Sequence, residues 1–267
     1  MAAASRRPPG MARSEFWTER TVRWYARALA RSDYADAVLG AIGPALADCR
    51  DALDVGAGTG ALTLALARRL THVTALEPTA AMAAEIRRAA TQAGLGNVAV
   101  VQATWEEARA APHDLVLCAH VSDLLRPGSA FLREVGAVAR RRVVLVRDAP
   151  GPGVGDKLFF GELYPLLLGR PYGSRCEADD TRAALRALGI EPWVRHVEYR
   201  SDQPFTDLEE ACEFYMAYLG LESADARAFL RRFLAGRLRR EGGELIAPFA
   251  KRAAVISWTP RGGPRRR

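Results

Sequence analysis

The sequence predicts an α/β fold built on a doubly wound, mostly parallel sheet of seven strands, with helical insertions that form a lid. Short apolar runs alternate with amphipathic helical segments from residue 51 onward. The runs lack the in-and-out alternation of half-exposed strands, which is typical of parallel strands covered by helices on both faces. The chain has 267 residues, of which 49% are hydrophobic and 26% charged, so it can bury a core of this kind.

Helical patterns come first along the chain. Ser14 is a candidate cap for a helix with apolar residues up to Leu29, and a second helix is expected from Asp33 until Gly43-Pro44 breaks it. Five strands separated by helical segments should follow, and this βαβαβ order predicts a Rossmann-like sheet. The five strands are expected at residues 52–55, 73–76, 98–101, 115–119 and 143–146.

The second half of the chain has a looser pattern. A helix is expected at 179–188 and a strand at 193–200. Residues 206–209, Thr-Asp-Leu-Glu, have the form of a capping box and predict the start of another helix. A further helix over about 223–240 and a last strand at 253–258 complete the pattern.

These elements predict one domain over residues 14–260, with helical insertions at about 150–175 and 205–241. The tails, 1–13 and 261–267, are predicted to be disordered. They hold three and four arginines and no acidic residue, which accounts for the whole net charge of +7 and leaves the body neutral. Basic tails can contact nucleic acid without sequence preference. A solvated tail is the commoner reading, so the charge does not by itself predict a nucleic-acid partner.

Cysteine usage and hydropathy indicate a cellular location. Cysteines stand at positions 49, 118, 176 and 212, none in a C-x-x-C pair, so neither a disulfide framework nor a zinc site is predicted. Cys118 falls in an apolar run and is expected in the core. No apolar run approaches the roughly 20 residues that span a bilayer. A cytoplasmic protein with no membrane segment is therefore expected.

The most informative segment is a glycine loop at residues 52–61, Ala-Leu-Asp-Val-Gly-Ala-Gly-Thr-Gly-Ala, between a strand and a helix. Such a loop also fits the dinucleotide pattern, so a nicotinamide-dependent oxidoreductase stays an alternative. Two acids favour another ligand. Asp54 ends the first strand, where a carboxylate suits a cationic amino acid and would repel a pyrophosphate. Glu77 ends the second strand and can chelate two ribose hydroxyls.

With these motifs the chain resembles the class I S-adenosylmethionine-dependent methyltransferases, and in particular their small-molecule branch. The resemblance rests on four regions: 53–60, 75–78 (Ala-Leu-Glu-Pro), 101–105 (Val-Gln-Ala-Thr-Trp) and 113–120 (His-Asp-Leu-Val-Leu-Cys-Ala-His). The N-terminal segment with Phe16, Trp17, Arg20, Trp24 and Tyr25 also resembles the first helix of the small-molecule branch. It implies S-adenosylmethionine as cofactor. The residues that it implies around the cofactor are Asp54, Gly56, Ala57, Gly58, Thr59, Gly60, Glu77, Pro78, Met82, Thr104, Trp105, Ala119 and His120.

One implied position departs from the family. The family often has an acid just before the position of Trp105, where it binds the adenine amine, and this chain has Thr104. A threonine hydroxyl can still accept that hydrogen bond. Trp105 itself is either a neighbour of the adenine or a core aromatic. The missing acid also leaves open a non-catalytic relative that only binds cofactor.

The ends of the fourth and fifth predicted strands should face the acceptor substrate, and His120 and Asp148 occupy them. His120 is a candidate general base, with a cofactor contact or simple packing as alternatives; Asp148 is a candidate catalytic residue, with strand-end capping as its alternative. The region after Cys118 lacks the Asn/Asp-Pro-Pro-aromatic pattern of enzymes that methylate base amines. These strand ends also lack the carboxylates and amide that would hold magnesium, so no metal is expected.

Aromatic residues in the N-terminal helix and the insertions suggest a small organic acceptor. The candidate substrate contacts are Trp17, Tyr25, Phe160, Tyr164 and Tyr215, for which ordinary packing is the alternative. An RNA or protein methyltransferase stays an alternative because of the basic tails. The sequence leaves open the acceptor, the methylated element and the oligomeric state.

Overall fold

The computed structural model describes residues 16–151, 156–173 and 177–260, so both predicted tails, Ser14 and Cys176 lie outside the described residues. The described chain divides into two compact units. Unit 1 contains residues 16–33, 156–173 and 199–251, and unit 2 contains residues 34–151, 177–198 and 252–260. None of the helices in the described ranges is long and apolar enough to cross a bilayer.

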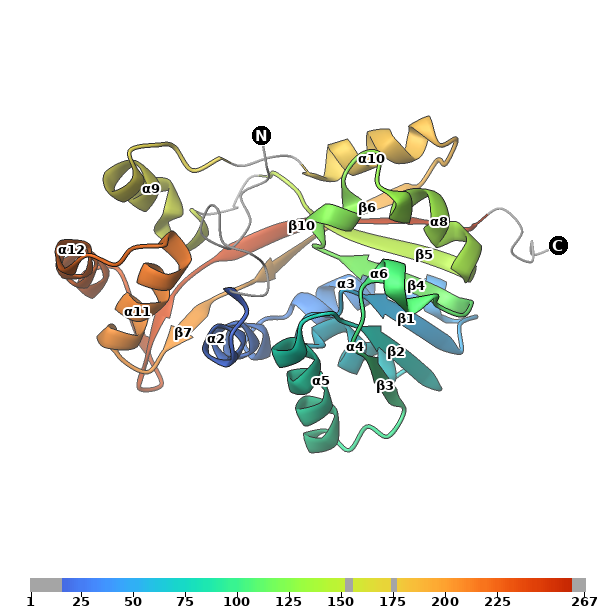
Figure 1. Ribbon diagram of the computed structural model, residues 1–267, viewed down its shortest axis with the longest axis horizontal. Helices are drawn as coiled ribbons and strands as arrows, with labels where there is room; N and C mark the ends of the chain where they lie inside the picture. The colour runs from blue at the N-terminus through green and yellow to red at the C-terminus, as the bar shows by residue number, and fades with distance from the viewer. Residues whose placement is uncertain (1–15, 152–155, 174–176, 261–267) are drawn as a thin grey trace. The chain divides into compact units, whose positions relative to one another are not determined.

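Unit 2 is built on the predicted sheet, and its seven strands run in the order β3-β2-β1-β4-β5-β10-β6 (Figure 1). The first five strands are mutually parallel, whereas β10 pairs with β5 in the antiparallel sense. All seven predicted strands are confirmed, with ends shifted by up to a few residues. Their bounds are β1 Asp51–Val55, β2 His72–Leu76, β3 Val98–Val101, β4 His113–Ala119, β5 Ala139–Asp148, β6 Trp193–Arg200 and β10 Ala250–Trp258.

Helices cover both faces of this sheet. Leu53 and Val55 of β1 belong to an apolar cluster with Phe131 of α8 and Leu185 of α10. Asp54 lies between these two residues, so its side chain points to the opposite face of the sheet. It accepts a hydrogen bond from α4, which therefore covers that face. The helices of unit 2 are α3 Tyr34–Leu46, α4 Ala61–Ala67, α5 Ala80–Gln92, α6 Trp105–Ala108, α7 Ser122–Leu125, α8 Ala130–Val138 and α10 Glu177–Ala187.

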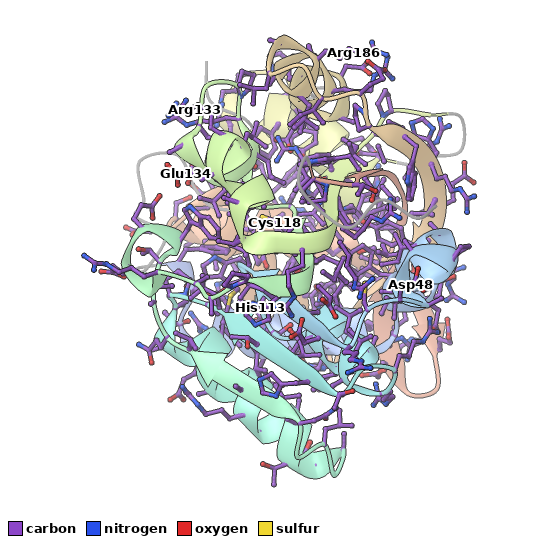
Figure 2. All side chains as sticks on the ribbon, turned by 90° about the vertical axis from the view of Figure 1, so that its right-hand side faces the viewer. Asp48, His113, Cys118, Arg133, Glu134 and Arg186 are labelled. Carbon is purple, nitrogen blue, oxygen red and sulfur yellow. The ribbon has the colours of Figure 1, made fainter. Side chains whose placement is uncertain are left out.

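The core of unit 2 follows the apolar runs. Cys118 of β4 is fully buried, which confirms the sequence prediction, and Figure 2 shows it inside the unit while Arg133 and Arg186 point outward. One prediction in this region was wrong: α3 runs through Gly43 and Pro44 to Leu46. A proline inside a helix costs one main-chain hydrogen bond and some strain. Four buried side chains on α3 offset that cost: Val38, Leu39, Ile42 and Leu46.

Unit 1 contains the N-terminal helix, most of the chain between β5 and α10, and most of the chain between β6 and β10. Three short antiparallel strands in the order β7-β9-β8 were not foreseen. Its helices are α2 Glu19–Ala30, the 3₁₀ turn η1 Lys157–Phe159, α9 Phe160–Leu168, α11 Leu208–Leu219 and α12 Ala224–Ala235. Its strands are β7 Gln203–Phe205, β8 Arg239–Glu241 and β9 Glu244–Ala247.

Two helix boundaries in unit 1 correct the sequence predictions. Asp207, not Thr206, caps α11, because its side chain accepts from the Glu210 amide at 2.8 Å. The helix expected over about 223–240 ends at Ala235. The chain beyond it forms the β8–β9 hairpin, whose turn contains Gly242 and Gly243 at φ +58° and +85°. This glycine pair is a hairpin signal that the sequence reading missed.

Ion pairs within unit 1 attach α2 to α11 and to the small sheet. Arg27 Nη1 is 2.7 Å from Glu210 Oε1, and Arg27 Nη2 is 3.0 Å from Glu244 Oε1. Arg31 continues the chain of charges to Glu244 at 3.1 Å and to Glu241 at 2.7 Å. Because these groups are partly exposed, water screens their charges, and the ion pairs add little to the free energy of unfolding. Their main effect is to orient α2 against α11 and the small sheet.

A buried tyrosine tests the packing of unit 1. Tyr215 is fully buried, and its hydroxyl has no hydrogen-bond partner among the described residues. Removing an unpaired buried hydroxyl relieves a desolvation cost, so Tyr215→Phe should leave the free energy of unfolding unchanged or raise it by up to about 1 kcal/mol. Urea unfolding would measure this. Tyr218→Phe on the same helix is the matched control, because its hydroxyl is not a buried unpaired group. A loss above about 1 kcal/mol for Tyr215→Phe alone would contradict this account.

Candidate active site

The glycine loop joins β1 to α4 at the C-terminal edge of the parallel strands. The amides of Gly56 and Ala57 both donate to the Leu76 carbonyl, at 2.8 and 3.1 Å, so the loop folds back over the end of β2. Gly56, Gly58 and Gly60 have φ values of +69°, +60° and +88°. Side chains rarely adopt this left-handed region, and a Cβ on Gly56 would also overlap Val121 Cγ2. The backbone conformation of the loop therefore requires glycine at these three positions.

Asp54 lies beneath this loop and is only 2% exposed. Its Oδ2 accepts a 2.6 Å hydrogen bond from the Thr63 hydroxyl of α4. Burial, together with the negative charge of Glu77, raises the pKa of Asp54 to about 6, although the Thr63 hydrogen bond acts to lower it. A buried carboxylate of this kind gains most from a cationic ligand, which would restore its charged form.

Glu77, at the end of β2, is fully buried and bonds to two main-chain amides. Oε2 accepts from Gly58 N at 2.9 Å, and Oε1 accepts from Thr79 N at 2.9 Å. The first bond ties the carboxylate to the glycine loop. Each carboxylate oxygen has a second lone pair, so Glu77 can still accept from a diol. These features fit the ammonium and ribose groups of an adenosyl amino acid.

The residues predicted near an adenine have different surroundings. Pro78 is exposed and Met82 is buried. Thr104 caps α6: its hydroxyl accepts from the Glu107 amide, while the Glu107 carboxylate accepts from Thr104 N at 2.8 Å. The Trp105 ring packs edge-on against Phe131 at 4.9 Å between centroids.

His120 and Asp148 come together at the ends of β4 and β5. His120 Nδ1 lies 3.4 Å from Asp148 Oδ1, and the His120 amide donates to Val146 O at 2.9 Å. His120, which follows Ala119, has φ +56°, an uncommon value for a residue with a side chain. The Tyr34 ring, from the start of α3, lies 5.6 Å from the imidazole. A histidine beside a carboxylate at this edge can accept or hold a proton.

The five predicted substrate residues all belong to unit 1. Trp17 and Tyr25 are half-buried and pack together at 5.4 Å between centroids. Phe160, Tyr164 and Tyr215 are buried in an aromatic core. Tyr215 lies 6.1 Å from Phe160, and Tyr164 lies 5.6 Å from Phe160.

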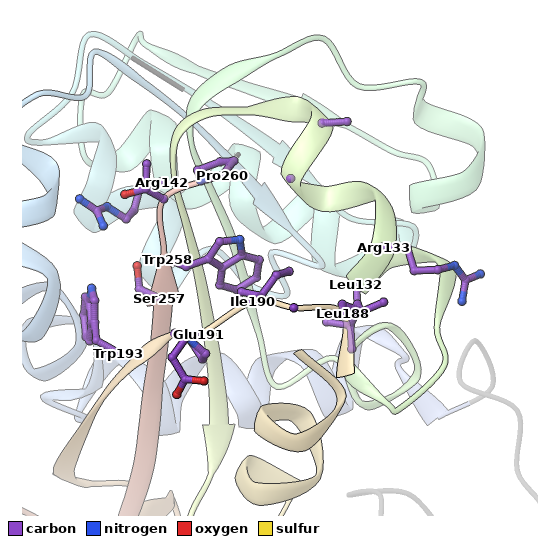
Figure 3. Close-up of a pocket in the computed structure, with 15 residues that line it drawn as sticks. Leu132, Arg133, Arg142, Leu188, Ile190, Glu191, Trp193, Ser257, Trp258 and Pro260 are labelled. Atoms are coloured by element: carbon purple, nitrogen blue, oxygen red, sulfur yellow. The ribbon is translucent and has the colours of Figure 1, made fainter. Parts of the chain in front are cut away.

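A cavity of about 930 Å³ in unit 2 lies at the end of the sheet opposite to Asp54, Glu77 and His120, and Figure 3 shows the residues that line it. Its lining includes residues 257–260 at the end of β10, which runs antiparallel to β5 and so ends toward the start of β5, whereas Asp148 ends β5. Ligands of open α/β sheets bind at the carboxyl ends of the strands. We therefore place the candidate active site at Asp54, Glu77 and His120.

Sequence reasoning missed three residues at this site. Thr63 bonds to Asp54, Val121 packs against Gly56, and Tyr34 packs against His120. Thr63 is the only one with a signal in the sequence, as a polar residue in the first turn of an apolar helix. The other two contacts join segments far apart in the chain, and no spacing rule connects them.

Residues 52–142 match the family model described as "Methyltransferase domain". This part of the chain is a methyltransferase domain, similar to those of the class I S-adenosylmethionine-dependent methyltransferases. The matched range begins in β1 and ends in β5, so it contains the glycine loop, Glu77 and His120. Methyltransferases of this class use S-adenosylmethionine as the methyl donor, and the buried carboxylates described above suit that ligand.

Two solved structures are similar to this chain at low sequence identity. A Bacillus halodurans C-125 protein provisionally described as a methyltransferase is 15% identical, with a TM-score of 0.50 over 84% of this chain and 99% of its own. Magnesium protoporphyrin IX methyltransferase from Synechocystis PCC 6803, with bound S-adenosylhomocysteine, is 16% identical, with a TM-score of 0.47 over 88% and 85%. A comparison with curated proteins found no match.

Gly56 offers a test of the loop geometry. Gly56→Ala should lower the free energy of unfolding by about 2–4 kcal/mol, because alanine is strained at φ +69° and its Cβ overlaps Val121 Cγ2. Val121→Ala removes the overlapping methyl. The loss of unfolding free energy in the double variant should therefore be about 1 kcal/mol smaller than the sum of the losses in the two single variants. Chemical denaturation of the four proteins measures the coupling. Strictly additive losses would refute the contact.

Proposed function

We propose that this methyltransferase transfers a methyl group to a small organic molecule in the cytoplasm. The observation that carries the proposal is the pair of buried carboxylates, Asp54 and Glu77, at the ends of neighbouring parallel strands. They suit an adenosyl amino acid and would repel a diphosphate, which disfavours a nicotinamide cofactor. The cytoplasmic location rests on the cysteine usage of the sequence.

The residues that would hold the cofactor fall into two groups. Asp54 and the loop backbone from Gly56 to Gly60, with Ala57 and Thr59, would bind the amino-acid end. Glu77 would accept hydrogen bonds from the ribose hydroxyls while it keeps the loop closed through Gly58. Around the adenine and the sulfur we place Pro78, Met82, Thr104, Trp105, Ala119 and His120.

When bound, S-adenosylmethionine supplies an electrophilic methyl group: the carbon–sulfur bond breaks as a lone pair of the acceptor bonds to carbon, and S-adenosylhomocysteine leaves. The residues of the chain position the acceptor and exclude water. Where the acceptor must lose a proton, His120 Nε2 would take it. Asp148, 3.4 Å from Nδ1, would orient the ring and stabilise its charged form.

The acceptor is proposed to be small because unit 1 is rich in aromatic side chains that suit an organic ring. Trp17 and Tyr25 are half-buried and can meet a ligand in their present state. Phe160, Tyr164 and Tyr215 are buried, so their contact with an acceptor requires a change of packing in unit 1.

Affinity for S-adenosylhomocysteine should depend on pH through Asp54. With a pKa near 6, Asp54 is protonated in the free protein at pH 5, and it must release that proton to bind the ligand's ammonium. The dissociation constant should therefore rise as pH falls below 6, by up to about tenfold per pH unit. Calorimetry at pH 5, 6, 7 and 8 measures this. Asp54→Asn should bind weakly at every pH and without this dependence; an equal slope in both proteins would count against the role.

The same pKa makes a stability prediction. A carboxyl whose pKa is raised on folding binds more protons in the native state between pH 4 and 6, so the free energy of unfolding falls as pH rises through that window. Asp54→Asn removes the buried charge and should stabilise the ligand-free protein at pH 7 by on the order of 2 kcal/mol. Urea unfolding of both proteins at pH 5 and pH 7 measures the pH dependence of stability and the effect of the substitution. A variant less stable than the parent at pH 7 would contradict the assignment.

Methyl transfer itself is tested with S-adenosylmethionine labelled in its methyl group and a cell extract divided into small-molecule, RNA and protein fractions. Label should enter the small-molecule fraction. His120→Ala should slow the reaction by about 10² or more if His120 is the base. His196→Ala, an exposed histidine on β6, is the matched control. Label in RNA or protein alone would replace the proposed acceptor, and no label in any fraction would favour a non-catalytic relative.

A further inference from the structure

The corner after β4, residues 120–122, is held from two sides. On one side His120 faces Asp148, as described above. Two residues further on, the Ser122 hydroxyl donates to Glu177 Oε1 at 3.4 Å, and Glu177 is the first residue of α10. The other oxygen of Glu177 is 3.0 Å from Arg147 Nη2. A connected polar chain therefore runs from the corner through α10 to β5.

Arg147 and Asp148 are consecutive at the end of β5, so their side chains point to opposite faces of the sheet. Asp148 reaches His120 on one face, while Arg147 reaches Glu177 on the other. Residues at the end of β5 thus take part in both sets of contacts that hold the corner after β4. Neither Arg147 nor Glu177 belongs to the residues that would contact cofactor or acceptor.

The ion pair between Arg147 and Glu177 joins β5 to α10 at a cost in desolvation free energy. The Arg147 side chain is 4% exposed and that of Glu177 16%. Nε and Nη1 of Arg147 have no hydrogen-bond partner among the described residues. Buried ion pairs often contribute less stability than apolar side chains of similar volume, and unpaired buried N–H groups add a further cost. Stability alone therefore does not account for the pair, whereas a requirement for fixed geometry does.

The geometry that the pair fixes includes one wall of the glycine loop. Between His120 and Ser122 lies Val121, whose Cγ2 occupies the space that a Cβ on Gly56 would need. A shift of the corner would move Val121 against the loop and would move His120 away from Asp148.

We propose that Arg147 and Glu177 are positioning residues, which hold the corner after β4 so that the loop can bind the cofactor and His120 stays beside Asp148. The inference rests on the proposed function for its cofactor, but the placement of His120 can be measured without it.

The experiment compares Arg147→Met, the double variant Arg147→Met/Glu177→Leu, and a control pair, Arg186→Met/Glu191→Leu. The control removes an ion pair of similar length, 2.9 Å, that is 51% and 73% exposed near the end of α10. Thermal unfolding reports stability, calorimetry reports S-adenosylhomocysteine affinity, and NMR reports the imidazole signals of His120. The chain has four histidines, so these signals can be assigned by substitution.

Arg147→Met should lower the unfolding temperature, because it leaves the Glu177 carboxylate buried without its partner. The double variant should recover that temperature, yet bind S-adenosylhomocysteine roughly tenfold more weakly and show shifted His120 signals. The control pair should change none of these. A stable double variant with parental affinity and parental His120 signals would overturn the proposal, as would one that stays as unstable as the single variant. If the parent protein binds no S-adenosylhomocysteine, the proposed function fails, and the His120 signals still decide this inference.

Discussion

The burial of two carboxylates side by side is the constraint on which the rest of unit 2 depends. Asp54 and Glu77 end adjacent parallel strands, and both are almost completely removed from water. Charges in that position need partners. Thr63 supplies one hydrogen bond to Asp54, and the amides of Gly58 and Thr79 supply two to Glu77. Burial and the nearby charge of Glu77 nevertheless raise the pKa of Asp54, and a cationic ligand would favour its charged form.

The same constraint explains why the loop is rich in glycine. The chain must turn from β1 into α4 close enough for the Gly58 amide to reach Glu77. That path requires left-handed backbone at three positions and leaves no room for a side chain at Gly56. The corner after β4 closes the loop from the other side through Val121. The candidate binding and catalytic groups thus share one small framework of contacts around the loop.

The stability of unit 1 depends on its aromatic core. It is assembled from three separated stretches of chain, which must bury enough apolar surface among themselves to form a core. Aromatic side chains from α9 and α11 achieve this, and Phe214 and Tyr218 stack at 4.1 Å. Within that core, the buried Tyr215 hydroxyl has no hydrogen-bond partner in the part of the chain that the structure describes. Aromatic richness, which the sequence suggested for substrate binding, therefore also has a structural role in this unit.

The sequence alone determined the order of elements, the seven strands and the glycine loop, because apolar period and glycine spacing are local properties that each segment carries. It also placed Asp54, Glu77, His120 and Asp148 at strand ends, since parallel strands bring their carboxyl ends to one edge. Only the tertiary structure decided the contacts of Thr63, Val121 and Arg147, the division into two units, and the β7-β9-β8 sheet. These depend on packing between distant segments, and the energy of such packing is not encoded in the spacing of neighbouring residues.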